Sequence, residues 1–189
     1  MIKKVYNKIR KIIGTAYINK SYAQCGEDLL ISFLAEKFGW KTFSYLDIGT
    51  NHPKKFNNTY LFYKRGSRGV CVEPDPSLIN IIKSARPGDT CVNVGLSAGE
   101  DAMADFYVMT VNTLNTFSKE DAEKLDKEGV YKIKEVIKVP LKSINTILSD
   151  NFKGKSPNLI SLDVEGGTKK LSEVWILINT DLNYYVLKP

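Results

Sequence analysis

The stretch Tyr45-Leu46-Asp47-Ile48-Gly49-Thr50-Asn51-His52-Pro53 decides how the rest of the chain is interpreted. Its first half is a short apolar run that predicts a buried strand over 44–48, and its second half is a turn of glycine and polar residues. Gly49 has no Cβ atom, so a ligand can approach the backbone closely where the strand ends. The stretch therefore predicts a binding site at the carboxyl end of a parallel strand.

A similar pattern follows in Gly69-Val70-Cys71-Val72-Glu73-Pro74, a second apolar strand that ends in an acid. The Glu73 carboxylate has two acceptor oxygens, which suits the two hydroxyl groups of a ribose. Strand, glycine turn, helix, strand and acid in this order are typical of a site for a nucleoside cofactor.

The glycine spacing narrows the kind of cofactor. Gly49 is followed by Thr50 and Asn51, so the chain lacks the Gly-x-Gly-x-x-Gly pattern that lets a dinucleotide pyrophosphate lie on bare backbone. S-adenosylmethionine carries no phosphate, so it could bind at a turn that has only one glycine. On the local pattern alone, a methyl-donor site and an ordinary turn without a ligand are equally open.

Composition favours one cytoplasmic domain. The chain has 189 residues, 43% of them hydrophobic, and no apolar run near the ~20 residues of a membrane span. Its N-terminus shows neither the apolar h-region nor the small-residue cleavage site of a secretion signal. Its three cysteines, Cys25, Cys71 and Cys91, are odd in number and unevenly spaced, which favours a reduced compartment. One histidine and no Cys-x-x-Cys argue against a zinc site, and we predict no metal.

Positive charge is concentrated at the N-terminus. Residues 1–20 contain six basic residues and no acid, and the remaining residues balance at 21 basic and 21 acidic. Isoleucines and Val5 recur at helical spacing there, so we predict a basic amphipathic helix over 1–20 ahead of a domain over 21–189. Packing of this helix on the domain is favoured over contact with an anionic membrane surface. The neutral body has no basic patch with interleaved aromatic residues, which argues against a nucleic-acid partner.

Strands and helices alternate along the chain, which predicts a mostly parallel sheet with helices on both faces. The polar residues at the predicted strand ends, Asp47, Glu73, Asn93 and Asp163, would then converge on one rim. Pro140 indicates an edge position for the strand Val136–Leu141. We expect helices at Glu27–Phe38, Asn58–Lys64, 77–85 and Lys119–Glu128, and the other strands at 44–48, 69–73, Thr90–Val94, Ala104–Met109 and Leu159–Leu162.

Several short motifs follow one another along the chain. They are Ser21-Tyr22-Ala23-Gln24-Cys25-Gly26-Glu27-Asp28, the stretch 46–53, Asn58-Thr59-Tyr60, Phe62-Tyr63, Glu73-Pro74, Arg86-Pro87-Gly88-Asp89, Leu114-Asn115-Thr116-Phe117-Ser118 and Leu162-Asp163-Val164-Glu165-Gly166. In this order they resemble the FkbM family of S-adenosylmethionine-dependent methyltransferases. The resemblance implies a Rossmann-like class I methyltransferase fold and O-methylation, often of a sugar hydroxyl in a glycan or natural product.

The resemblance also assigns roles around the cofactor. It implies that Asp47, Gly49 and Asn51 line the methionine part and that Glu73 holds the ribose. It further implies that Asn93, Gly95 and Leu96 lie against the adenine.

A second set of roles concerns the transferred methyl group. Asp163, Glu165 and His52 are candidates for the base that draws the proton from an acceptor hydroxyl. Alternatives are a turn position for His52 and a divalent cation held by the two acids. Glu27 and Asp28 either close the site or act as charges at a helix N-terminus, and both interpretations are open.

The chain departs from the family pattern after Gly166. The apolar run Val174–Ile178 supplies at most one further strand, so we expect the last strands of the sheet to be missing and an edge to be exposed. An exposed edge favours self-association, which predicts a homo-oligomer.

The main hypothesis is a cytoplasmic, S-adenosylmethionine-dependent O-methyltransferase that acts on a carbohydrate or glycan precursor. One alternative is a methyltransferase-like protein that binds the cofactor and is inactive. Another is a nucleotide-sugar enzyme, although its phosphates would need a glycine-rich turn that this chain lacks.

Overall fold

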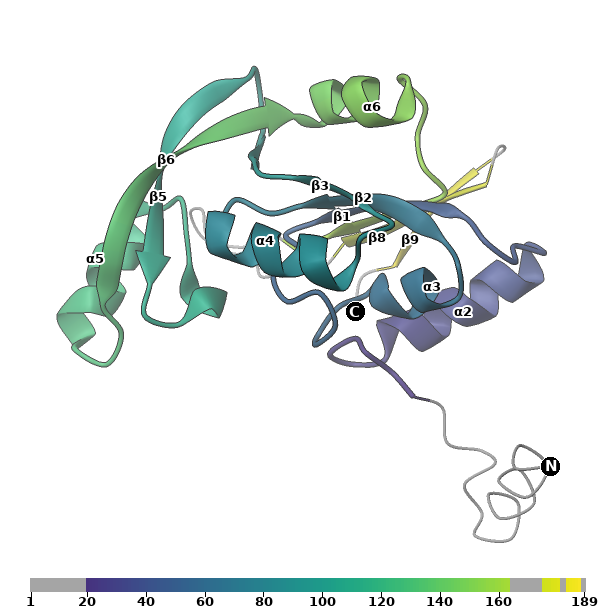
Figure 1. The fold of residues 1–189 in the computed structure, drawn as a ribbon, viewed down its shortest axis with the longest axis horizontal. Coiled ribbons are helices and arrows are strands. Elements are labelled where there is room, and N and C mark those ends of the chain that lie inside the picture. Colours follow the sequence, from purple (N-terminus) through teal and green to yellow (C-terminus); the bar gives the residue numbers. More distant parts are fainter. Residues whose placement is uncertain (1–19, 164–174, 181–182, 188–189) are drawn as a thin grey trace, which may run out of the picture.

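The computed structural model describes residues 20–163, 175–180 and 183–187. The predicted helix over 1–20 therefore lies almost wholly outside the described residues, as does Glu165. The fold is mixed α/β and contains two sheets (Figure 1).

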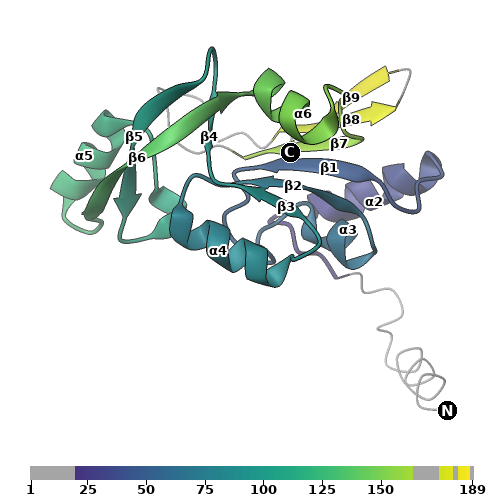
Figure 2. The same ribbon diagram turned by 45° about the horizontal axis from the view of Figure 1, so that its top comes forward.

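The larger sheet has six strands in the order β3-β2-β1-β7-β8-β9, which can be followed in Figure 2. Strands β3, β2, β1 and β7 are parallel to one another, and β8 and β9 continue the sheet as antiparallel strands. Their bounds are β1 Ser44–Ile48, β2 Arg68–Val72, β3 Thr90–Val92, β7 Leu159–Leu162, β8 Trp175–Thr180 and β9 Asn183–Leu187.

Helices cover both faces of this sheet, as the sequence predicts. Alternate residues of β1 point to opposite faces, and Tyr45 and Leu46 are both fully buried. Tyr45 belongs to a core under α2 (Glu27–Lys37) and α3 (Tyr60–Lys64), whereas Leu46 packs with α6 (Ile144–Phe152) on the other side.

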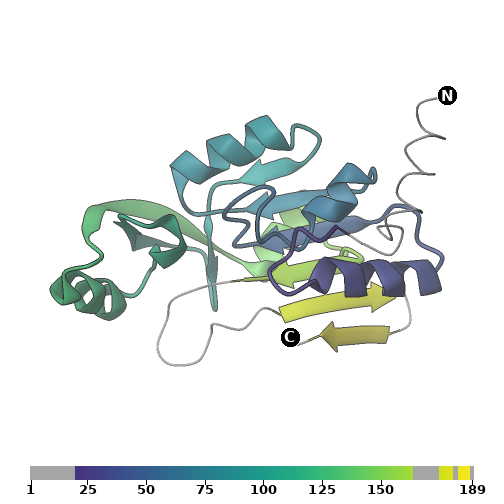
Figure 3. The ribbon, with the colours of Figure 1, turned by 90° about the horizontal axis from the view of Figure 1, so that it is seen from below.

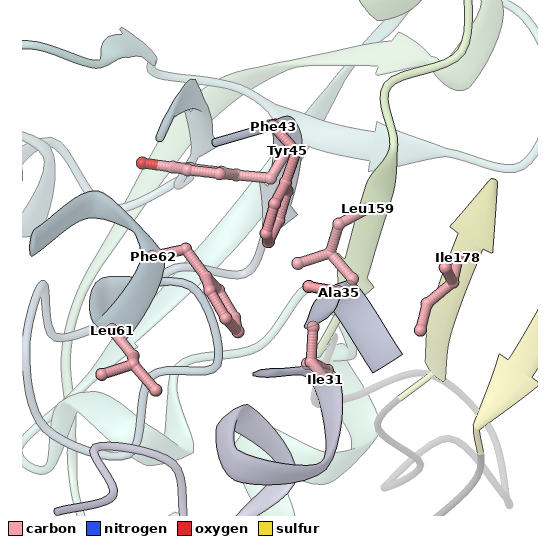
Figure 4. Packing of buried hydrophobic residues seen from close by; sticks show 8 residues of the cluster. All are labelled: Ile31, Ala35, Phe43, Tyr45, Leu61, Phe62, Leu159 and Ile178. Atoms are coloured by element: carbon pink, nitrogen blue, oxygen red, sulfur yellow. The ribbon is translucent and has the colours of Figure 1, made fainter. Parts of the chain in front are cut away.

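Figure 3 shows α2 lying across the sheet beside β8, and Figure 4 shows the side chains that converge there. Ile31 and Ala35 of α2 pack toward Leu159 of β7 and Ile178 of β8. Helix α4 (Pro76–Ala85) lies on the same face, where Ile79 and Ile82 contact Cys71. Its start is fixed by Asp75, whose side chain accepts a hydrogen bond from the Ser77 N–H, and by Pro76 in the first turn.

A second sheet of three strands, in the order β4-β6-β5, stands beside the carboxyl ends of the parallel strands. Its strands are β4 Gly95–Ser97, β5 Ala102–Met109 and β6 Ile133–Ser143, and the connection from β5 to β6 carries η2 (Asn112–Leu114) and α5 (Lys119–Glu128). Helix α5 covers one face through Ala122, which packs on Tyr107 and Met109. Phe106 and Val108 are buried on the opposite face.

Four details of the fold differ from the sequence prediction. The predicted strand Thr90–Val94 ends at Val92, and the chain then crosses to the second sheet as β4. Helix α6 was not predicted, although Ser143 caps it by accepting from the Thr146 N–H.

The predicted edge position of the strand around Pro140 is wrong, because β6 is the middle strand of its sheet. The pairing with β4 begins only at Leu141, so Pro140 has a neighbouring strand on one side alone. The expected absence of further strands after Val174–Ile178 is also wrong, because β9 pairs with β8 as a hairpin.

A buried arginine joins the parallel strands to the segments that follow them. The Arg86 side chain is 0% exposed. Its guanidinium contacts Asp89 through Nε at 2.8 Å and Asp47 through Nη1 at 3.5 Å. Its Nη2 donates to the Tyr45 hydroxyl and to Thr59 Oγ1, each at 2.9 Å.

The two carboxylates of this network have further partners. Asp47 Oδ2 accepts from Thr59 Oγ1 at 2.7 Å and from Asn57 Nδ2 at 3.1 Å. Asp89 accepts from the Tyr45 hydroxyl at 2.6 Å and from the Gly69 N–H at 3.0 Å. Among the described residues, no buried side-chain nitrogen or oxygen lacks a hydrogen-bond partner, so the charges are fully satisfied.

We expect Arg86→Ala to lower the free energy of unfolding by about 3–5 kcal/mol, because two buried carboxylates lose their cation. Urea denaturation followed by circular dichroism measures this loss. Lys83→Ala is the matched control, since Lys83 is an exposed cation in the last turn of α4. Equal stability of the two variants would show that the network contributes nothing.

Candidate functional site

A cavity of about 330 Å³ lies between the carboxyl ends of the parallel strands and the second sheet. Its volume is at the lower end of the range of small-molecule sites. Six of the residues predicted from sequence line it: Gly49, Asn51, Glu73, Gly95, Leu96 and Asp163.

The floor of the cavity is the turn after β1. Gly49 has φ 75°, and a Cβ atom there would lie 1.7 Å from the Asp163 carbonyl oxygen. The turn is held by the Gly49 and Thr50 N–H groups, which both donate to the Val72 carbonyl. Any side chain at position 49 would separate β1 from β7, so glycine is required by both conformation and space.

Glu73 lies 5% exposed at the end of β2 and is held by backbone groups. Its Oε2 accepts from the Asn51 N–H at 2.8 Å, and its Oε1 accepts from the Asp75 N–H at 3.0 Å. Each carboxylate oxygen has capacity for more than one hydrogen bond, so both can accept from a ligand in the cavity as well. Burial raises the pKa of Glu73 to about 7, although these two backbone donors act in the opposite direction.

Asp163 ends β7 and faces the cavity beside Gly49. Its N–H donates to the Ile48 carbonyl at 2.9 Å, which continues the pairing of β7 with β1. Burial raises the pKa of the Asp163 carboxyl, and the charges of Asp47 and Glu27 raise it further. A carboxylate with a raised pKa is a stronger base than an exposed one, and among the described residues none donates a hydrogen bond to the Asp163 carboxylate oxygens.

The opposite wall is aromatic and comes from the second sheet. Phe106 and Phe117 pack with ring centroids 4.7 Å apart, and both line the cavity. A Cβ atom on Gly95 would lie 2.4 Å from Phe117 and 2.6 Å from Leu141, so the glycine allows these side chains to close over β4. The result is an apolar slot beside Leu96.

Asn115 connects the two sheets at the rim of the cavity. Its Nδ2 donates to Asp75 Oδ2 at 2.9 Å, and its Oδ1 accepts from the Met109 N–H at 2.8 Å. Asp75 also caps α4, so one carboxylate fixes both the helix and the second sheet. Asn112 and Thr113 of η2 line the same rim.

Sequence reasoning did not identify Phe106, Asn112, Thr113, Asn115 and Phe117 as site residues. Asn115 and Phe117 lie within the motif Leu114-Asn115-Thr116-Phe117-Ser118, so the family resemblance could have identified these two as site residues.

Two predicted residues lie near the cavity without lining it. Asp47 points to the face of β1 that α3 and α4 cover, where it belongs to the Arg86 network. Asn93 donates through Nδ2 to the carbonyls of Glu73 and Pro74, at 2.7 Å and 2.8 Å. Both side chains therefore support the turns that carry the lining residues.

His52 is exposed and belongs to the turn after Asn51. Its Nδ1 accepts from the N–H groups of Lys54 and Lys55, at 3.0 Å and 2.9 Å. In a neutral imidazole the proton then sits on Nε2, so neither nitrogen is a free acceptor in this arrangement.

Glu27 and Asp28 start α2 and differ in their surroundings. Glu27 accepts from the Cys25 N–H, and its charge acts on Asp163. Asp28 is fully buried and accepts from Ser21 Oγ and the Tyr22 N–H. In the described part of the chain, no three or more histidine, cysteine or acidic side chains gather as a metal site.

Because the pKa of Glu73 is raised, the free energy of unfolding should depend measurably on pH. Its pKa is about 7 in the folded chain against an ordinary 4.5, so the folded state binds more protons between these values. The free energy of unfolding therefore falls as pH rises through this window. Glu73→Gln removes the titration, so we expect its stability relative to wild type to increase from pH ~5 to pH ~8 in urea denaturation. Parallel curves for the two proteins would contradict the assignment, since any pH-independent cost of the amide cancels.

Comparison with known proteins agrees with this geometry. The family model described as the Methyltransferase FkbM domain matches residues 47–170, from the turn-bearing strand β1 to beyond β7. No curated protein and no solved structure matches the chain significantly. The matched range is more than half of the 189 residues and contains most of the cavity. The chain belongs to the FkbM methyltransferase family.

Proposed function

We propose that the protein is an S-adenosylmethionine-dependent O-methyltransferase of the class I fold that methylates a hydroxyl group of a sugar or glycan precursor. The observation that carries the proposal is the pairing of a bare glycine turn with a buried carboxylate inside one cavity, at Gly49 and Glu73. Family membership supports methyl transfer, and the cavity supports a nucleoside-bearing cofactor.

The residues of the cavity fit the parts of this cofactor. Glu73 has spare acceptor capacity for two ribose hydroxyls, because each oxygen accepts one backbone N–H. The slot between Leu96 and Phe117 suits a flat, apolar adenine ring. Gly49 and Asn51 leave backbone exposed for the methionine part, and Asp47 and Asn93 hold the turns from outside the cavity.

When bound, the cofactor supplies a methyl group on a positively charged sulfur. Asp163 lies at the Gly49 end of the cavity and accepts the proton of the acceptor hydroxyl in this proposal. Burial raises the pKa of its carboxyl, which makes the carboxylate more basic. In this proposal the cavity walls also increase the rate of methyl transfer, because they hold the cofactor and the acceptor in position.

The three cysteines in the described residues are free thiols, which is consistent with a cytoplasmic protein. None of the described helices combines the length and the apolar content that a membrane span needs.

Isothermal titration with S-adenosylhomocysteine tests the cofactor site. We expect Glu73→Ala to weaken binding by about 2–4 kcal/mol, since two hydrogen bonds to a carboxylate are lost. Glu100→Ala is the control, because Glu100 is an exposed acid away from the cavity lining. Equal affinity of the two variants would rule out a ribose at Glu73, and failure of the wild type to bind would rule out the cofactor.

Methyl transfer to a panel of monosaccharides and methyl glycosides tests the reaction. We expect Asp163→Asn to lower turnover by about 10²–10⁴-fold and to leave S-adenosylhomocysteine affinity nearly unchanged, because the carboxylate acts on the acceptor proton. Asp105→Asn on the exposed side of β5 is the control. Full activity of Asp163→Asn would exclude this residue as the base. Cofactor binding without transfer to any acceptor would favour an inactive, cofactor-binding protein.

A further inference from the structure

A cluster of lysines and aromatic rings lies next to the cavity and has no role in the site described so far. We call it the lysine–aromatic patch. It consists of Lys20, Tyr22, Lys54, Lys55, Phe56, Tyr60 and Lys64.

Each lysine of the patch lies over an aromatic ring. Lys20 and Lys64 lie 5.1 Å and 5.3 Å from the Tyr22 ring centroid, and Lys64 also donates to the Tyr22 hydroxyl at 2.8 Å. Lys54 lies 6.0 Å from the Tyr60 ring, and Lys55 lies 4.8 Å from the Phe56 ring. The Tyr22 and Tyr60 rings meet edge to face at 4.8 Å, which joins the two halves of the patch.

The positive charge of the patch is not compensated by acids. Residues 51–68 contain five basic residues and no acidic residue. None of the ion pairs among the described residues includes a lysine of the patch. The four ammonium groups are exposed, so they are available to an anion from solution.

Backbone hydrogen bonds hold the patch against the core. The Asn57 N–H donates to the Tyr22 carbonyl at 2.9 Å, and the buried Asp28 accepts from the Tyr22 N–H at 2.7 Å. Asn57 is itself a partner of Asp47 in the Arg86 network. The rings and lysines are therefore carried on segments that the folded core fixes.

The patch begins where the cavity lining ends. Asn51 lines the cavity, and Lys54 follows three residues later, so their Cα atoms are within about 11 Å of each other. The turn at His52 folds this segment back and shortens the distance further. The Lys54 end of the patch is therefore close enough to Asn51 for one extended ligand to contact both the cavity and the patch.

We propose that the patch binds a phosphate or carboxylate group of a saccharide acceptor while a hydroxyl of the same molecule enters the cavity. This inference rests on the proposed function and narrows its substrate class to anionic saccharides.

The chemistry of the patch fits such a ligand. Lysine ammonium groups suit a phosphate or carboxylate as point charges. Phe56, which is 58% exposed and has the Lys55 ammonium over its ring, offers apolar contact area to a sugar beside a positive charge. Tyr22 and Tyr60 cover each other edge to face, so the patch lacks the series of open rings that stacks successive bases of a nucleic acid.

The test compares binding of glucose 6-phosphate, glucuronic acid and glucose by isothermal titration, with and without saturating S-adenosylhomocysteine. We expect both anionic sugars to bind more tightly than glucose, and Lys54→Ala/Lys55→Ala to weaken them by about tenfold or more. The matched control is Lys124→Ala/Lys127→Ala, which removes two exposed lysines from α5. The phosphate and carboxylate probes separate the two possible sources of the anion.

Several outcomes would overturn the inference. These are equal binding by the two double variants, glucose binding as tight as that of the anionic sugars, and inorganic phosphate binding as tight as glucose 6-phosphate. Tighter binding of a ten-residue oligothymidylate, or of phosphatidylserine vesicles, would instead assign the patch to another partner. Wild-type protein that binds the anionic sugars but not S-adenosylhomocysteine would refute the proposed function and leave the anion site standing.

Discussion

The buried Arg86 guanidinium is the interaction on which the rest of the structure depends. It lies between Asp47 of β1 and Asp89 after α4, and it donates to Tyr45 and Thr59. Two carboxylates and one cation are costly to bury, so this cluster is stable only if every donor and acceptor is paired, as it is among the described residues. The geometry of the cluster therefore fixes β1 relative to the segment before α3 and to the end of α4. Because Gly49 follows Asp47 by two residues, the floor of the cavity is positioned from the face of the sheet that α3 and α4 cover.

Much of the parallel sheet and part of the site could be predicted from the sequence, because their signals are local. The strand 44–48, the glycine turn and Glu73 each follow from a few neighbouring residues, and the structure brings Gly49, Glu73 and Asp163 to one cavity. Asp47 shows the limit of this reasoning. A strand-end acid was expected at the rim, but alternation along β1 turns its side chain toward the helices. The aromatic wall and the lysine–aromatic patch escaped prediction because their residues come from separate segments that only the tertiary fold brings together. Strand β9 escaped for a different reason. Its residues Asn183–Leu187 are mostly aromatic and apolar and favour a strand, but the departure from the family pattern after Gly166 led us to expect the sheet to end at Val174–Ile178.

The two sheets contribute different chemistry to the cavity. The parallel sheet supplies charged and backbone groups at its strand ends, whereas the second sheet supplies aromatic side chains from the face that α5 leaves open. Asp75 links them, because it caps α4 and accepts from Asn115 at the rim. The cavity thus lies between two separately built sheets that this polar contact joins at the rim.

The two glycines that line the cavity differ in whether they can be substituted, because Gly49 approaches the Asp163 backbone and Gly95 approaches side chains. At position 49 even a methyl group would overlap a backbone carbonyl, which has no way to move aside without breaking the pairing of β1 and β7. At Gly95 the nearest atoms belong to the ends of the Phe117 and Leu141 side chains, which can adopt other rotamers or be replaced by smaller residues. Of these two positions, therefore, only the one on the second sheet lets a substitution reshape the cavity without breaking a strand pairing. A lineage of such proteins could acquire new ligand preferences through β4, β6 and the segment around Phe117 while the β1 turn stays invariant.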